Sequence, residues 1–93
     1  MSAVERELRV YVDRTGAAPL SRWLESLADR TAVAKIRVRS ARARMGNLGR
    51  CRFVGSGTWE FKIDFGPGYR IYFAEIEGGK LLLLCGGDKR SRA

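Results

Sequence analysis

The chain has 93 residues, of which 45% are apolar and 30% charged; this predicts one globular domain, residues 1–93, and excludes a disordered chain. No apolar run approaches the roughly 18 residues that cross a bilayer, and the charged N-terminus does not resemble a signal peptide, so we expect a cytoplasmic protein without a membrane partner. Two cysteines and no histidine predict free thiols, no bound metal and no cofactor, while the net charge of +8 favours a polyanion or an acidic protein as partner.

The N-terminal third predicts a strand followed by a helix. Apolar residues alternate with more polar ones over residues 8–12, which is the period-two pattern of a strand. Leu20, Trp23, Leu24 and Leu27 then recur at helical spacing, and Pro19 lies near the start of this pattern. We therefore expect a short amphipathic helix over residues 20–27.

A second helix is expected over residues 31–45, ending at Gly46. Its buried side stays open at this stage, because two sets of apolar residues lie on opposite sides of the helix. One set is Ala34, Val38, Ala41 and Met45, and the other is Ile36 and Ala43.

Residues 50–85 read as four strands separated by three glycine-rich turns, at residues 55–57, 66–68 and 78–79. The fold class is thus α+β, with the N-terminal strand and two helices packed on one face of an antiparallel meander. Placing Phe65 opposite Tyr69 puts the apolar residues of the two middle strands on one face and pairs Asp64 with Arg70 and Lys62 with Tyr72.

The other face of this meander is predicted to be polar and mostly basic. The first hairpin pairs Arg52 with Glu60 and Arg50 with Lys62. Arginine and lysine beside a tyrosine suit phosphates and stacked bases. The polar face therefore comprises Arg50, Arg52, Glu60, Lys62, Asp64, Arg70 and Tyr72.

An apolar strip is expected to border this polar face. If Gly78 and Gly79 form a two-residue turn, the last strand places two of its leucines on the side of Arg70. Such a strip is typical of a partner site. Its members are Ala74, Ile76, Leu81 and Leu83. The same register puts Cys85 opposite Tyr72 and away from Cys51.

Positive charge is concentrated in one block of the chain. Residues 31–52 carry seven bases and no acid, namely Lys35, Arg37, Arg39, Arg42, Arg44, Arg50 and Arg52. A solvated surface usually mixes both signs. We therefore predict contact with a polyanion such as RNA, with Lys35, Arg39, Arg42, Arg50 and Arg52 as binding residues and Tyr72 stacking on a base.

The order of elements and the string "GNLGRCRFVGSGTWEFKIDFGPGYRIYF", with "LLLLCGGDKRS" after it, resemble the RelE/ParE toxin superfamily, and within it the HigB-like addiction-module killer proteins. The resemblance covers nearly the whole chain. It implies the toxin of a type II toxin–antitoxin module, which cleaves mRNA on the ribosome and is neutralised by an antitoxin from an adjacent gene, expected to be of helix-turn-helix type.

The resemblance also implies site residues. The arginine of the motif "GYR" falls on Arg70, the preceding strand's basic residue on Lys62, and the basic pair after the last strand on Lys89 and Arg90. Metal-independent RNA cleavage needs charge stabilisation at phosphorus and two proton transfers. Arg70 is expected to stabilise the added charge, Lys62 or Glu60 to accept a proton, and Lys89 and Arg90 to act near the leaving group.

Two other functions stay open. The "GYR" strand and the two-helix start also occur in ParE-like proteins that inhibit DNA gyrase. A protein of this fold that has lost activity and only binds antitoxin or nucleic acid is the other alternative.

Overall fold

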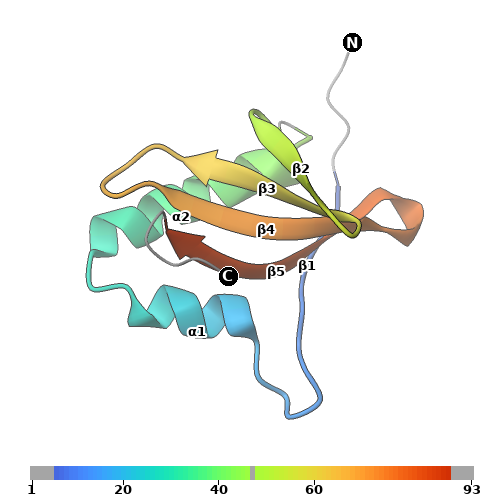
Figure 1. Cartoon of the computed structure of the whole chain (residues 1–93), viewed down its shortest axis with the longest axis horizontal. Helices are drawn as coiled ribbons and strands as arrows, with labels where there is room; N and C mark the ends of the chain where they lie inside the picture. Colours follow the sequence, from blue (N-terminus) through green and yellow to red (C-terminus); the bar gives the residue numbers. More distant parts are fainter. Residues whose placement is uncertain (1–5, 47, 89–93) are drawn as a thin grey trace.

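The computed structural model describes residues 6–46 and 48–88, and two helices pack against a five-stranded sheet in it (Figure 1). This confirms the α+β class. Within the described residues, neither helix is long and apolar enough to cross a membrane. The elements in chain order are β1 (Leu8–Val10), α1 (Pro19–Ser26), α2 (Arg30–Arg44), β2 (Cys51–Gly55), β3 (Thr58–Ile63), β4 (Tyr69–Ile76), a 3-10 turn (Glu77–Gly79) and β5 (Lys80–Asp88).

The sheet is mixed and has the strand order β1-β5-β4-β3-β2. Strand β1 pairs in parallel with β5, while all other neighbours are antiparallel. The prediction that the first strand packs on one face of the meander is therefore wrong, because β1 extends the sheet at its edge. Parallel neighbours need a long connection, and here it runs through both helices and the three strands β2, β3 and β4.

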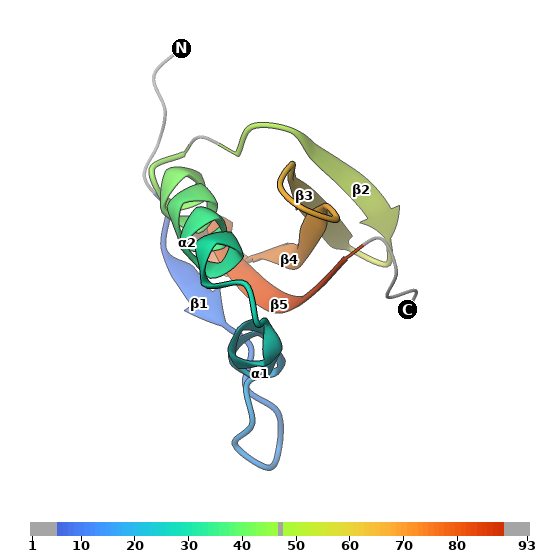
Figure 2. The same cartoon turned by 90° about the vertical axis from the view of Figure 1, so that its left-hand side faces the viewer.

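Both helices contribute to one core. Leu20 of α1 and Ile36 of α2 are buried together with inward-facing residues of β3, β4 and β5, among them Phe61, Ile71 and Leu81. Figure 2 shows α2 nearly end-on, with the strands following an arc beside it. The sheet thus has one face covered by helices and one open face.

The local signals for α1 and α2 work as expected. Helix α1 begins at Pro19, whose missing N–H is not needed there. The Asp29 carboxylate caps α2 by accepting hydrogen bonds from the backbone N–H groups of Thr31 (3.0 Å) and Ala32 (3.2 Å). Gly46 follows the last turn of α2 with a φ of 92°, a conformation that favours glycine.

The structure resolves which side of α2 is buried. Ala32, Val33, Ile36 and Ala43 face the core, whereas the competing set is exposed, with Val38 at 53%. Arg39 and Arg42 of α2 share a cavity with Lys62 of β3, which sets up the basic surface described below.

The first hairpin has the predicted register, with Cys51 opposite Phe61, Arg52 opposite Glu60 and Phe53 opposite Trp59. The second hairpin differs by two residues, because Lys62 lies opposite Arg70 instead of Tyr72. Strand β3 ends at Ile63, so a longer connection replaces the predicted tight turn. Since side chains alternate with a period of two, this shift preserves the faces.

The last strand corrects the predicted apolar strip. Three residues, Glu77–Gly79, form the turn, so Ile76 pairs with Lys80 and the side chains of residues 81–83 change face. Leu81 and Leu83 are consequently in the core, with 1% and 4% exposure, and their assignment to an open strip is wrong. On the open face, Ala74 pairs with Leu82 instead.

A β-bulge restores the predicted register farther along β5. Phe73 pairs with Leu83 but Tyr72 pairs with Cys85, which leaves Leu84 as the additional residue. Cys85 is therefore opposite Tyr72, as predicted. It lies on the open face, whereas Cys51 pairs with the buried Phe61, and both cysteines are free thiols.

Candidate polyanion-binding site

The open face of the sheet places two cations directly opposite each other. Lys62 of β3 pairs with Arg70 of β4, and Lys62 is exposed while Arg70 is half-buried. Like charges in such a pair repel and destabilise a sheet. On the other side of Arg70 lies Gly87 of β5, which has no side chain to offset the charge. An anion bound between Lys62 and Arg70 would remove this repulsion.

One pair farther along the same strands lie Glu60 and Tyr72. Glu60 is only 1% exposed, although its strand position is on the open face as predicted. The Arg52 guanidinium of β2 lies beside it, with Nη2 3.0 Å from Oε1 of Glu60. A buried carboxylate normally needs such a cation.

A basic trench, formed by three adjoining cavities of about 480, 400 and 220 Å³, runs between α2 and the first hairpin. Lys62 contributes to all three cavities. The basic side chains that line the trench are Lys35, Arg39, Arg42, Arg50, Arg52 and Lys62. These come from the acid-free block of residues 31–52 and from β3, so the structure brings together cations up to 27 positions apart (62 − 35).

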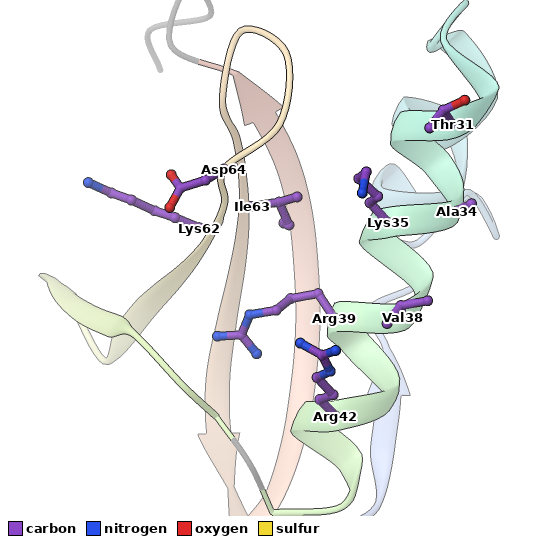
Figure 3. A pocket seen from close by; sticks show the side chains of 9 residues that line it. All are labelled: Thr31, Ala34, Lys35, Val38, Arg39, Arg42, Lys62, Ile63 and Asp64. Atoms are coloured by element: carbon purple, nitrogen blue, oxygen red, sulfur yellow. The ribbon is translucent and has the colours of Figure 1, made fainter.

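Figure 3 shows how the side chains in the largest of these cavities are oriented. Lys35, Arg39 and Arg42 project from α2 toward the strands, whereas Lys62 and Asp64 project from β3 away from α2. Lys62 therefore belongs to the rim that the trench shares with the open face. A bound chain of phosphates can follow α2 and reach the pair of Lys62 and Arg70.

Arg39 has a structural role within this trench. Its guanidinium donates hydrogen bonds to the carbonyl oxygens of Leu48 and Arg50, the second over 3.4 Å, and lies 4.7 Å from the centre of the Phe61 ring. Burial lowers the pKa of Arg39. The arginine thus ties the connection between α2 and β2 to the helix.

Gly49 makes this contact possible. It has a φ of 59°, and a Cβ atom there would lie 2.8 Å from Nη2 of Arg39. Sequence analysis identified Arg39 as RNA-binding and did not single out Gly49. The glycines that follow α2 can be seen in the sequence, but nothing in their spacing indicates that Arg39 is the residue that packs against Gly49.

The remaining predicted site residues lie in different places. Lys35 is turned toward the β3–β4 connection, with its Nζ 5.0 Å from the centre of the Phe65 ring. Tyr72 is half-buried between Glu60 and Cys85, and burial raises the pKa of the Cys85 thiol. Lys89 and Arg90 lie outside the described residues. Ala74 and Ile76 continue along β4, beyond Tyr72.

The cations of the trench and of the open face are arginines and lysines, whose side chains suit anionic groups. Over residues 6–46 and 48–88, no group of three or more His, Cys, Asp or Glu side chains is arranged to hold a metal ion. Arginine presents a planar fork that matches phosphate oxygens, and lysine adds a point charge. The arrangement can therefore bind and orient a phosphodiester at Lys62 and Arg70.

Comparison with other proteins identifies a relative. No family model matches the sequence. A Haemophilus influenzae protein, described as an uncharacterized protein, is 43% identical over 70 residues, which cover 75% of this chain and 71% of that protein. The chain therefore belongs to the same protein family as this H. influenzae protein.

Proposed function

We propose that the protein is the toxin of a type II toxin–antitoxin module and acts in the cytoplasm as a ribosome-dependent, metal-independent mRNA endoribonuclease. The observation that supports this most is the pairing of Lys62 with Arg70 at the rim of the basic trench. A surface that only binds polyanions can spread its cations and so avoid the repulsion between two of them. A phosphate that gains negative charge during a reaction, in contrast, is stabilised by two cations held close to it.

The proposed reaction uses the RNA as its own nucleophile. The 2′-oxygen attacks the adjacent phosphorus, the bond from phosphorus to the 5′-oxygen breaks, and a 2′,3′-cyclic phosphate and a 5′-hydroxyl form. Arg70 and Lys62 bind the phosphate oxygens and stabilise the charge that develops on them. Tyr72, on the same face, holds a neighbouring base by stacking.

Two proton transfers complete this scheme. Glu60 lies one pair away from the cation pair on the same two strands, but Arg52 must move before it can take the proton of the 2′-hydroxyl. Lys62 is exposed and can take the same proton when its side chain is an uncharged amine, in which case Arg70 alone carries the positive charge at the phosphate until the proton has moved. Lys89 and Arg90 are proposed to protonate the leaving 5′-oxygen or stabilise its charge.

The proposed partner is an antitoxin encoded beside the toxin and carrying a helix-turn-helix domain. Its toxin-binding segment would cover the open face, where Leu82 takes the place of Leu81 and Leu83 in the apolar strip with Ala74 and Ile76. These side chains adjoin Tyr72 along β4. A segment bound there blocks access to Arg70.

This function is tested by inducing the chain in cells without the antitoxin. We expect growth arrest and new mRNA 5′ ends in polysomes, and we expect Arg70→Ala to abolish both while the protein stays folded, because Arg70 is on the open face. Arg14→Ala, at an exposed arginine in the β1–α1 connection, is the matched control and should keep full toxicity. Arrest with DNA damage and intact mRNA would contradict the proposal and favour gyrase inhibition.

A further inference from the structure

A buried carboxylate lines the second cavity of the trench, which is otherwise basic. This cavity of about 400 Å³ is formed by Gly49, Arg50, Cys51, Arg52, Glu60 and Lys62. Oε1 of Glu60 is buried, and no group in the described part of the chain offers it an aligned hydrogen bond. The Arg52 guanidinium approaches to 3.0 Å but only as an ion pair. Such an atom retains the capacity to accept a hydrogen bond from a ligand.

We propose that this cavity binds a guanine base of single-stranded RNA and that Glu60 reads its Watson–Crick edge. A carboxylate only accepts hydrogen bonds and can accept two in parallel. Guanine presents two adjacent donors, N1–H and the N2 amino group. Adenine, cytosine and uracil each place an acceptor next to their donor on that edge. This acceptor would lie against a carboxylate oxygen, which is also an acceptor, and the two would repel each other. Bases of single-stranded RNA are open to this kind of recognition.

Arg52 occupies the position of the base in the unbound protein. Its guanidinium carries N–H donors, as the guanine edge does, and its Nη2 already lies 3.0 Å from Oε1 of Glu60. The Arg52 side chain is 63% exposed, whereas that of Glu60 is 1% exposed. The exposed arginine side chain has room to swing into solvent, and the base then replaces it as the partner that the buried carboxylate needs. Its charge then remains at the mouth of the cavity, where it can contact a phosphate.

The surrounding cations favour a nucleotide chain over an isolated base. Arg50 and Lys62 line this cavity and also the smaller one next to it, which continues to Arg39 and Arg42. Phosphates on either side of the bound guanosine would thus meet positive charge. The inference rests on the proposed function, since it assigns a base preference to the same RNA-binding surface. Because Glu60 then holds the base, the proton of the 2′-hydroxyl is left to Lys62.

The first test compares mononucleotides on the full-length wild-type protein by isothermal titration calorimetry. GMP should bind at least about tenfold more tightly than IMP, which lacks only the N2 amino group, because a hydrogen bond to a charged acceptor is lost. AMP should bind no better than IMP. Equal affinities for GMP, IMP and AMP would overturn the inference, and this comparison needs no variant that might misfold.

The second test replaces the carboxylate. Glu60→Gln keeps the shape of the side chain but turns one of its two acceptor oxygens into an NH2 donor, so it cannot accept the two parallel hydrogen bonds of the guanine edge. The preference for GMP over IMP should therefore disappear while affinity for the phosphate is retained. Glu75→Gln makes the same change in another arginine-paired carboxylate, 2.5 Å from Arg6 and outside this cavity, and should keep the preference. Circular dichroism verifies that both variants are folded. A preference that survives in folded Glu60→Gln would overturn the assignment of Glu60.

Oligonucleotides then separate this inference from the proposed function. A uridine oligomer with one central guanosine should bind more tightly than the same oligomer with inosine, and more tightly than GMP. If it gains nothing over GMP, the ligand is a free guanine nucleotide and the RNA assignment is wrong. If cells show mRNA cleavage but the guanosine and inosine oligomers bind equally, the guanine site is wrong and the proposed ribonuclease function is supported. If the guanosine oligomer binds more tightly but no RNA is cut, the guanine site is supported and the ribonuclease function is wrong.

Discussion

Arg39 and Arg42 illustrate how differently two arginines of one helix can act. They are three residues apart on α2, and both line the basic trench. Arg39 is held by two backbone carbonyl oxygens and the Phe61 ring, whereas Arg42 is exposed. The charge of Arg39 is therefore used mainly to fix the chain between α2 and β2. That of Arg42 is available to a ligand.

This difference predicts that alanine substitutions at the two positions change the free energy of unfolding by very different amounts. Arg39→Ala should lower the free energy of unfolding by about 1–3 kcal/mol, because two carbonyl oxygens lose a charged donor. Arg42→Ala should change it by no more than about 0.5 kcal/mol, as is usual for exposed side chains. Both are measured by chemical denaturation. Equal losses of stability would show that Arg39 is not a structural anchor.

At the scale of elements, the turn before β5 determines which leucines are available to a partner. Leu82 and Leu83 are neighbours in sequence but belong to opposite faces, with Leu83 in the core and Leu82 half-buried on the open face. One additional residue in the turn between β4 and β5 produces this assignment. Aspartate substitutions at the two positions therefore report the register directly.

Leu83→Asp should prevent folding, because it places an unpaired charge inside the core. Leu82→Asp should leave the protein folded and, if the antitoxin covers the open face, weaken that complex at least tenfold. Thermal unfolding followed by circular dichroism measures the first effect, and titration with the antitoxin measures the second. If Leu83→Asp were stable and Leu82→Asp were unfolded, the assignment of Leu83 to the core and of Leu82 to the open face would be wrong.

Most elements could be predicted because their signals are local. The spacing of Leu20, Trp23 and Leu24, the glycine after α2 and the glycine-rich hairpin turns all act within a few residues of chain. Turn lengths could not be predicted, since Gly78 and Gly79 fit both a two-residue and a three-residue turn. The pairing of β1 with β5 joins residues more than 70 positions apart, and no local pattern encodes it.

For the candidate site, the sequence predicted only which face of the sheet its residues share. Alternation along β3 and β4 was sufficient to place Glu60, Lys62, Arg70 and Tyr72 on one side of the sheet. The burial of Glu60 was not predictable, because it depends on how neighbouring elements cover the strand. The structural role of Arg39 depends on how the connection after α2 folds back to the helix, 9 to 11 residues further along the chain, so its charge alone suggested a ligand contact.

At the scale of the whole molecule, the positive charge is arranged as a path. It follows α2, crosses the rim at Lys62 and ends at Arg70 on the open face. The N-terminal 30 residues have five bases and five acids, so they contribute no net charge. Long-range attraction of a polyanion is therefore directed to one side of the protein.

This arrangement predicts the salt dependence of RNA binding. For single strands, the logarithm of the affinity falls by about 0.7 per phosphate contact for each tenfold rise in salt. Lys62→Ala and Arg70→Ala should each reduce this slope by about 0.7, whereas Arg14→Ala should leave it unchanged. Fluorescence anisotropy with a labelled RNA measures the slope. Equal slopes in all four proteins would exclude Lys62 and Arg70 as phosphate contacts.

The position of β5 between β1 and β4 also has a consequence for synthesis. Strand β5 is made last, yet both of its neighbours depend on it for their backbone hydrogen bonds. While the chain is still emerging from the ribosome, β1 has no partner and the leucines that complete the core are missing. Folding that waits for such distant pairings is slow. The cation pair thus acquires its supporting core only once β5 has left the ribosome, so no shorter nascent chain can present this site in its folded form.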